Sequence, residues 1–219
     1  MIIEQIIKTL NKTELGLGGT NERYAQCRQI DCLEEWHQDA DSSHKIEFTD
    51  KETGDLVKFN IYFNGQVRGS SGKVNRENRI VAGVDYFANK KNLQPGDSIL
   101  FEKLFDEQMS ISSYYVDVER HGKRITFQKS KDSFVVLNID RLNSFIDENG
   151  NELKISYNGY WFDCRVELLE DDFCKIIFSD GENTPFSESD ISKDDLLLLD
   201  LDNKKISQID PLLFSRFKY

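Results

Sequence analysis

The clearest pattern of apolar and polar positions in the chain is an alternation along residues 58–64. Phe59, Ile61 and Phe63 are separated by polar residues there, so they would share one face of a β-strand. The same criteria predict short strands at residues 24–30, 45–49, 98–102, 114–118, 124–128, 134–139, 153–157, 160–168 and 173–178. Many short strands favour small antiparallel barrels over a parallel sheet.

The start of the chain shows a different spacing. Its apolar residues are Ile2, Ile3, Ile6, Ile7 and Leu10, which is the spacing of a helix face. We therefore expect a short amphipathic helix over residues 1–11. The acidic segment 31–41 is expected to be an insertion or a connection between strands, and the tail 194–219 has no clear pattern.

Turn residues separate the predicted strands. Asn64-Gly65, Asn158-Gly159 and Asp180-Gly181 are typical hairpin turns, and Leu93-Gln-Pro-Gly-Asp97 predicts a turn before the strand at 98–102. Polar residues 129–133 mark a boundary, so we expect one domain at residues 1–130 and a smaller β-rich accessory or interaction domain at residues 131–219. The expected fold class is mainly β with short helices (α+β).

Charge is distributed unevenly along this chain of 219 residues, whose net charge is −11. Residues 131–219 hold 19 acids against 10 bases, whereas residues 1–130 hold 20 against 18. Within residues 64–91 the balance reverses, with six bases against Glu77 and Asp85. A basic patch on a nearly neutral domain fits a sequence-specific reader of DNA, whereas the overall charge argues against indiscriminate binding to nucleic acid.

Two polar stretches carry the side chains best suited to contact DNA. One is residues 69–87, a basic and amide-rich run, and the other is residues 12–24, which contains three glycines. Arginine pairs with guanine and asparagine with adenine, a carboxylate accepts from the cytosine amino group, and lysine and serine contact phosphates. The candidate DNA-binding residues are Lys12, Thr13, Glu14, Thr20, Asn21, Arg23, Arg68, Ser70, Ser71, Lys73, Asn75, Arg76, Glu77, Asn78 and Arg79.

The order and content of these stretches resemble a known family. Residues 12–23 and 72–80 are similar to the two arms of the DNA-binding pseudobarrel of plant transcription factors (the B-three type), in the variant found in restriction endonuclease specificity domains such as the EcoRII effector domain, BfiI and the LlaJI N-terminal region. The resemblance covers about residues 8–120. It implies a seven-stranded-type open pseudobarrel whose two loops grip the major groove of double-stranded DNA. It also implies a restriction system in which a nuclease or a nucleotide-driven motor subunit or domain acts beside this chain.

The second domain resembles a Tudor-type small barrel, on the residues 156–168 and 174–183. Trp161 and Phe162 stand where an aromatic cage would be, but aromatic residues in strands usually pack inward, so we expect them in the core. This likeness implies a small antiparallel β-barrel-like domain. A protein-interaction module is accordingly one alternative function for the chain.

A small metal-dependent endonuclease is the other alternative. Its candidate residues are Asp140 and Glu152, which would hold the metal, and Lys154, which would position the attacking water. Asp117 and Glu119 with Lys123 form a weaker match of the same kind. We expect Glu152 and Lys154 to be exposed beside a turn and unable to share a metal with Asp140. The favoured interpretation assigns this chain no catalytic residues.

Cysteine and histidine content points to no cofactor either. Cys27, Cys32, Cys164 and Cys174 occur without a secretory signal, so free thiols are expected in a cytoplasmic protein with no membrane span. The spacing of Cys27, Cys32, His37 and His44 matches no standard zinc finger or ribbon. We therefore expect neither a metal nor a cofactor.

Overall fold

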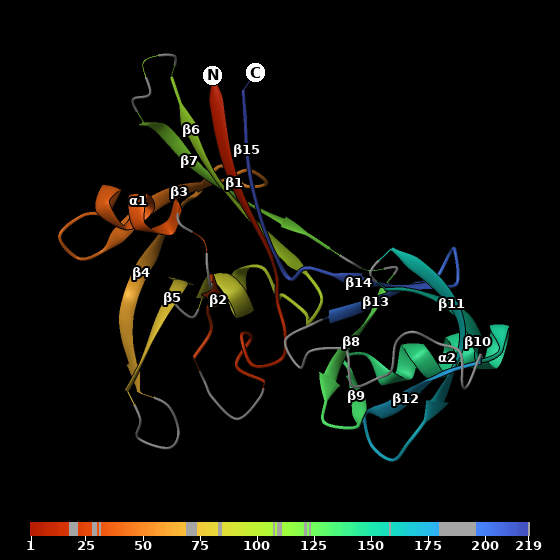
Figure 1. Cartoon of the computed structure of the whole chain (residues 1–219). Helices are drawn as coiled ribbons and strands as arrows, with labels where there is room; N and C mark the ends of the chain where they lie inside the picture. The colour runs from red at the N-terminus through yellow and green to blue at the C-terminus, as the bar shows by residue number, and fades with distance from the viewer. Residues whose placement is uncertain are drawn as a thin grey trace. The chain divides into compact units, whose positions relative to one another are not determined.

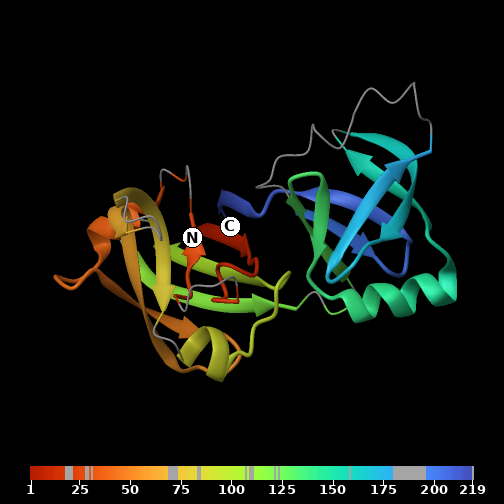
Figure 2. The ribbon, with the colours of Figure 1, turned by 90° about the horizontal axis from the view of Figure 1, so that it is seen from below.

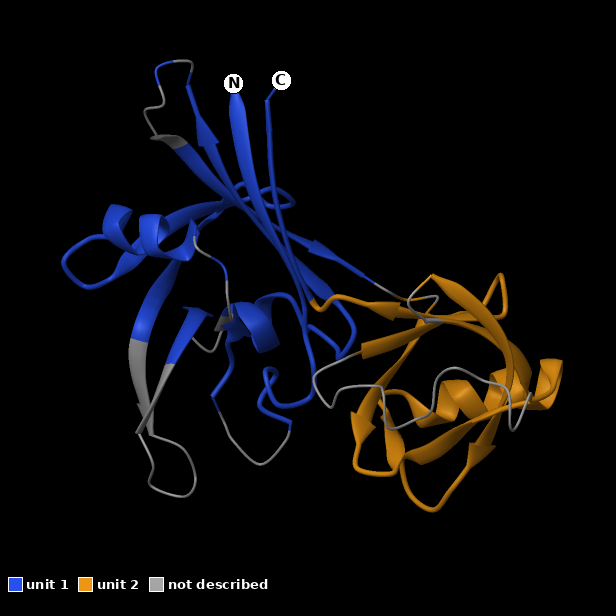
Figure 3. Cartoon of the chain, in the orientation of Figure 1, with its two compact units in different colours: residues 1–120, 212–219 blue, residues 121–211 orange. Residues whose placement is uncertain are grey.

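The structure is a computed structural model in which the chain forms two compact units. Unit 1 comprises residues 1–120 and 212–219, and unit 2 comprises residues 121–211 (Figure 3). The described residues are 1–17, 22–27, 30, 32–68, 74–82, 85–106, 108, 111–120, 122, 124–157, 159–179 and 196–218, with the backbone alone at 65–68, 74–76, 85, 111, 112 and 157. Among them, no helix is long and apolar enough to cross a membrane.

Unit 1 is an open, curled sheet of eight strands in the order β15-β1-β6-β7-β3-β4-β5-β2 (Figure 1). Its neighbouring strands pair antiparallel, except that β3 and β7 are parallel. The elements are β1 Ile2–Thr9, β2 Ala25–Gln26, α1 Cys32–Asp39, β3 Lys45–Asp50, β4 Leu56–Arg68, β5 Val74–Ala82, the π-helical turn η1 Asp85–Lys90, β6 Ser98–Phe105, β7 Ile111–Glu119 and β15 Leu212–Lys218. The predicted mainly-β class with short helices is confirmed.

Unit 2 is a closed barrel of seven strands in the order β10-β11-β12-β9-β8-β13-β14. The elements are β8 Arg124–Ser130, β9 Ser133–Val136, α2 Ile139–Asn149, β10 Glu152–Tyr157, β11 Tyr160–Leu168, β12 Phe173–Phe178, β13 Leu196–Asp200 and β14 Lys205–Ile209. Pairing of Tyr157 with Tyr160 across Gly159, whose φ is 81°, confirms the predicted hairpin there. The Asp180-Gly181 turn lies outside the described residues. The barrel closes through the parallel pair β10 and β14.

The helix predicted for residues 1–11 is wrong, because residues 2–9 form strand β1. This strand pairs with β15 on one side and β6 on the other, so both of its edges are hydrogen-bonded. Alternate residues Glu4, Ile6 and Lys8 are buried, as a strand requires. Its isoleucines are β-branched and suit a strand, whereas their spacing alone also fits a helix.

The Asn64-Gly65 hairpin turn is also wrong. Strand β4 continues through this point to Arg68, and the register against β5 shifts between Tyr62 and Gly65. Asn64 has a φ of 52°, and its N–H donates to Asn78 Oδ1 at 2.8 Å. A left-handed asparagine therefore makes a bulge within the strand rather than a turn at its end.

Two helices lie where the sequence predicted none. The acidic segment contains α1, whose buried residues Cys32, Leu33 and Trp36 face the sheet while Glu34 and Glu35 are exposed. Helix α2 follows β9, with Asn138 Oδ1 accepting from Arg141 N–H at its start. Figure 2 shows α2 along one side of the barrel. Leu142 and Phe145 of this helix belong to the barrel core.

The division between units differs from the expected boundary at residue 130. Residues 129–133 close the β8–β9 hairpin, so β8 belongs to the barrel, and the chain returns to unit 1 as β15. Each unit has its own core. Unit 1 packs Trp36, Phe48, Phe59 and Phe101 together, with Phe48 and Phe59 edge-to-face at 5.2 Å. These contacts hold the strands that position the candidate site.

Candidate nucleic-acid interface

Strands β4 and β5 form a two-stranded ribbon at one end of the unit 1 sheet (Figure 1). Strand β2 pairs with β5 only at Arg79 and Ile80, and Cys27 N–H donates to Asn78 O at 2.9 Å. From Glu77 back to Val74, β5 pairs with residues 65–68 of β4 and, among the described residues, with no third strand. The ribbon, defined as residues 65–68 and 74–77, carries the predicted residues Arg68, Asn75 and Arg76.

The second predicted stretch, between β1 and β2, is fixed at its base by a buried ion pair. Lys8 Nζ lies 3.0 Å from Glu14 Oε1, with both side chains almost wholly buried. Glu14 also accepts from the N–H groups of Asn11 and Gln26 at 3.1 and 2.9 Å. A carboxylate held by three donors in this way is committed to the loop, so we assign Glu14 to supporting it rather than to reading cytosine.

Arg79 joins the two stretches. Its guanidinium lies 3.0 Å from Glu22 Oε2, donates from Nε to Glu77 Oε2 at 2.7 Å, and stacks over the ring of Tyr24 at 3.9 Å. Burial raises the pKa of Tyr24 above its ordinary value, and the Arg79 charge opposes this rise. Gln26 Nε2 donates to the same Glu77 oxygen at 3.1 Å. One network of charged side chains therefore connects the two stretches where each of them joins the sheet.

These contacts separate the predicted site residues into groups. Glu14, Glu77, Asn78 and Arg79 make internal contacts at the base of the ribbon and loop. Arg23 Nε donates to Leu15 O at 3.2 Å, which binds it to its own loop, while Thr13 is exposed. Arg68, Asn75 and Arg76 lie on the ribbon backbone. The predicted residues that lie outside the described part of the chain are Thr20, Asn21, Ser70, Ser71 and Lys73.

The basic surplus of residues 64–91 is partly internal. Lys91 is 4% exposed and donates to Asp50 Oδ1 at 3.0 Å, and Lys90 lies 2.8 Å from Asp55 Oδ2. Arg79 is neutralised by Glu22 and Glu77, as described above. The charge counted from the sequence therefore overstates the charge that is available to a phosphate. Of the other bases of that stretch, Arg68 and Arg76 lie on the ribbon, and Lys73 is outside the described residues.

The alternative sites predicted from the sequence are dispersed. Glu152 and Lys154 are exposed on β10, as expected, while Asp140 lies in the first turn of α2. Among the described residues, no three His, Cys, Asp or Glu side chains are grouped to hold a metal. All four cysteines are buried, and none of them forms a disulfide. His37 and His44 stack at 4.7 Å, and His37 Nδ1 contacts Ile61 O at 2.7 Å.

Trp161 and Phe162, neighbouring aromatic residues on β11 of the barrel, differ in burial. Phe162 packs against the core and meets Phe178 edge-to-face at 6.1 Å, as predicted. Trp161 is 54% exposed, so its predicted place in the core is wrong. The alternation of β11 sends neighbouring residues to opposite faces, which separates the two rings.

Sequence reasoning missed the contacts of Glu22 and Tyr24 with Arg79, and the grouping of Trp161 with lysines on the barrel surface. The adjacent bases Lys204 and Lys205 in an acidic tail were a usable signal for the second feature. Comparison with known families found no family model that matches the chain, and comparison with curated proteins found no match. The functional argument therefore depends on the residues themselves.

Proposed function

We propose that unit 1 recognises double-stranded DNA in a sequence-specific manner, with the β4–β5 ribbon in the major groove. The observation that carries the proposal is the two-stranded extension of residues 65–68 and 74–77 beyond the pairing with β2. Four residues of strand extend roughly 13 Å at about 3.3 Å per residue. The major groove is about 12 Å wide and about 8.5 Å deep and admits a two-stranded ribbon.

The residues on the ribbon suit this position chemically. Arg68 and Arg76 are candidates for guanine or phosphate, and Asn75 for adenine. The β1–β2 loop supplies Lys12 and Thr13, which would contact the phosphates of the second DNA strand. Ser70, Ser71, Lys73, Thr20 and Asn21 complete the proposed interface from the sequence.

The charged network of Arg79 has a separate task in this proposal. It holds the ribbon and the β1–β2 loop together before DNA arrives, because Arg79 contacts Glu22 at one side and Glu77 at the other. A preorganised pair of contact segments loses less conformational entropy on binding. Cleavage, in the restriction system that the resemblance implies, would be carried out by a partner nuclease or motor.

Selection of bound sites from random duplex DNA with the full chain tests the proposal. We expect enrichment of a defined short sequence. We also expect affinity for it to fall with rising salt, since phosphate contacts release counterions. Binding without enrichment would contradict sequence-specific recognition, and no binding at low salt would contradict DNA recognition altogether.

The position of the interface is tested with variants of one strand. Arg68→Ala on the ribbon should weaken binding, whereas Lys58→Ala should not. Lys58 is a suitable control because it is an exposed base on the same strand β4, before the bulge, 3.9 Å from Glu47. Equal losses for both variants would move the interface away from the ribbon.

A further inference from the structure

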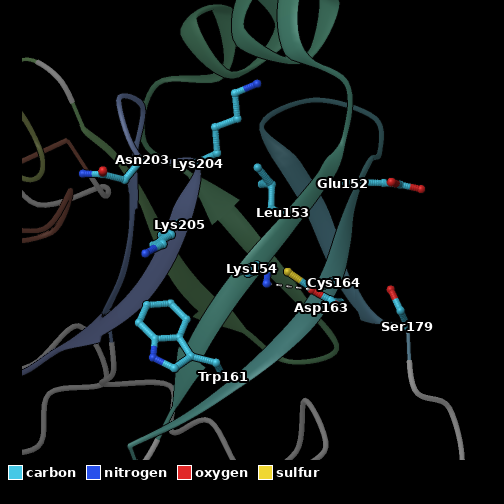
Figure 4. Close-up of a pocket in the computed structure, with 10 residues that line it drawn as sticks. All are labelled: Glu152, Leu153, Lys154, Trp161, Asp163, Cys164, Ser179, Asn203, Lys204 and Lys205. Atoms are coloured by element: carbon cyan, nitrogen blue, oxygen red, sulfur yellow. Dashed lines mark ion pairs between the residues drawn. The ribbon is translucent and has the colours of Figure 1, made fainter.

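A separate surface feature lies on the barrel of unit 2. It is a groove of about 880 Å³, within the range of about 300–1,000 Å³ typical of small-ligand sites. Its lining includes Lys154 of β10, Trp161 and Asp163 of β11, Lys204 in the turn before β14, and Lys205 at the start of β14 (Figure 4). We call this feature the barrel groove.

Positive charge is concentrated in the barrel groove although the surrounding sequence is acidic. Lys154 and Lys205 are register partners on the adjacent parallel strands β10 and β14. Like charges at such positions destabilise a sheet, but each lysine also has an acid as its register partner on the other side, Asp163 of β11 for Lys154 and Asp200 of β13 for Lys205. Asp163 Oδ1 lies 3.9 Å from Lys154 Nζ, but both side chains are mostly exposed and such a pair contributes little.

Lys204 and Lys205 remain without a carboxylate within ion-pair distance among the described residues, since the described ion pairs include neither. Both side chains are exposed. Glu152, the other acid of the groove lining, points away from Trp161 in Figure 4. The groove therefore presents Lys204 and Lys205, neither of them in a described ion pair, to an incoming anion.

Trp161 gives the barrel groove a second property. The residue is 54% exposed, and Lys205 Nζ lies 5.1 Å from the centre of its ring. Figure 4 shows Lys205 beside the indole, Lys154 close by, and Lys204 farther off with its ammonium directed away from the ring. A flat π surface and a cation thus lie within the dimensions of one small ligand.

We propose that the barrel groove binds a nucleotide, with its base stacked on Trp161 and its phosphate at Lys205 and Lys154. Base stacking uses the exposed aromatic face, and the lysines match the phosphate charge. An acidic peptide would satisfy the lysines but leave the indole in water. An apolar ligand would use the indole but leave the cations unpaired. The nucleotide is either free or part of a single strand, since both present the same chemistry.

The experiment titrates the full chain with AMP, with ATP, with adenosine and with a short oligothymidine single strand. Binding is followed by calorimetry and by tryptophan fluorescence. The two tryptophans report separately, because Trp36 is fully buried in unit 1 and Trp161 is exposed in unit 2. We expect saturable quenching of Trp161 by nucleotides, and weaker binding of adenosine because it lacks phosphate. Tighter binding of the oligonucleotide than of AMP and ATP identifies a single strand as the source, and the reverse identifies a free nucleotide.

Variants decide whether the groove is the site. Trp161→Ala should weaken binding about tenfold or more, as expected from the loss of a stacked base. Lys205→Ala should reduce both the affinity and its salt dependence. Lys175→Ala is the matched control, because Lys175 is exposed on β12 of the same barrel outside the groove.

Two results would overturn the proposal: no saturable binding of any of these nucleotides or of the oligonucleotide, or binding that Trp161→Ala leaves unchanged. Recognition of duplex DNA by unit 1 is independent of this site. Arg76→Ala should therefore leave the quenching of Trp161 unaltered. The two proposals are therefore tested by separate measurements, and one can fail while the other holds.

Discussion

Arg79 Nη1 lies 3.0 Å from Glu22 Oε2, and this ion pair connects two segments that are 57 residues apart in the chain. The Arg79 side chain is 7% exposed, while Glu22 is 54% exposed. The same guanidinium contacts Glu77 and the ring of Tyr24. A single buried cation thus links the base of the ribbon to the end of the β1–β2 loop.

Replacing Arg79 by methionine should destabilise unit 1. The change leaves Glu77 largely buried without its cation, so the free energy of unfolding should fall by about 2–4 kcal/mol. Urea unfolding followed by Trp36 fluorescence measures this, in a Trp161→Phe background so that only unit 1 reports. Lys58→Met is the control in the same unit, since its ion pair with Glu47 is exposed and should contribute less than about 1 kcal/mol. Equal effects of the two changes would contradict the assignment.

The buried pair of Asp50 and Lys91 gives unit 1 a predictable pH dependence. Burial acts to raise the pKa of Asp50, but hydrogen bonds from Lys91 and the Glu52 and Thr53 N–H groups outweigh it and lower the pKa below its ordinary 3.8. Burial acts to lower the pKa of Lys91, but Asp50 and Glu52 outweigh it and raise the pKa above its ordinary 10.5. A carboxyl group whose pKa is lowered by folding stabilises the folded state at pH values above its unfolded pKa. An ammonium group whose pKa is raised by folding stabilises the folded state at pH values below its own unfolded pKa.

Asp50→Asn should therefore destabilise unit 1 by about 3 kcal/mol near neutral pH, because it leaves Lys91 buried without its main partner. The difference from wild type should shrink as the pH falls below 3.8 and as it rises above 10.5. Unfolding measured across this range checks the prediction. Glu47→Gln, which changes a half-exposed acid paired loosely with Lys58, should leave the profile unaltered. A constant difference at all pH values would show that the charge pair is not the cause.

The four cysteine thiols should be unreactive in the native chain. Burial raises the pKa of Cys27 to about 12, and burial with the nearby Asp163 charge raises that of Cys164 to about 12. Only about one thiol in ten thousand would then be a thiolate at about pH 8, and the thiolate is the nucleophile. A disulfide reagent such as Ellman's should react slowly before and rapidly after addition of denaturant. Rapid labelling of the folded chain would contradict the burial of these residues.

The fold was predictable where one local pattern determines the element. The alternation of Phe59, Ile61 and Phe63 correctly predicts a strand, as do the apolar positions of β6, β7 and β11. The spacing of Ile2, Ile3 and Ile6 was ambiguous, because the choice depends on the partners β6 and β15. These partners are about one hundred and two hundred residues away, and their pairing decides between a helix and a strand.

The candidate site shows the same limit. Composition and turn residues identify both polar stretches. In the structure the strands next to these stretches, β2 and β5, pair with each other. The sequence could not reveal that Arg79 and Glu14 are buried, because their partners Glu22, Tyr24 and Lys8 are recognised only after the strands pair. Charge counted along a sequence does not distinguish a cation that faces solvent from one already neutralised by the fold.

The most direct test of the central claim is the affinity of wild type and Arg76→Ala for a selected duplex and for a scrambled duplex. If the ribbon reads bases, Arg76→Ala should lose about 1–3 kcal/mol on the selected site and little on the scrambled one. Equal losses on both duplexes would make Arg76 a phosphate contact. No loss on either duplex would contradict a DNA interface at the β4–β5 ribbon.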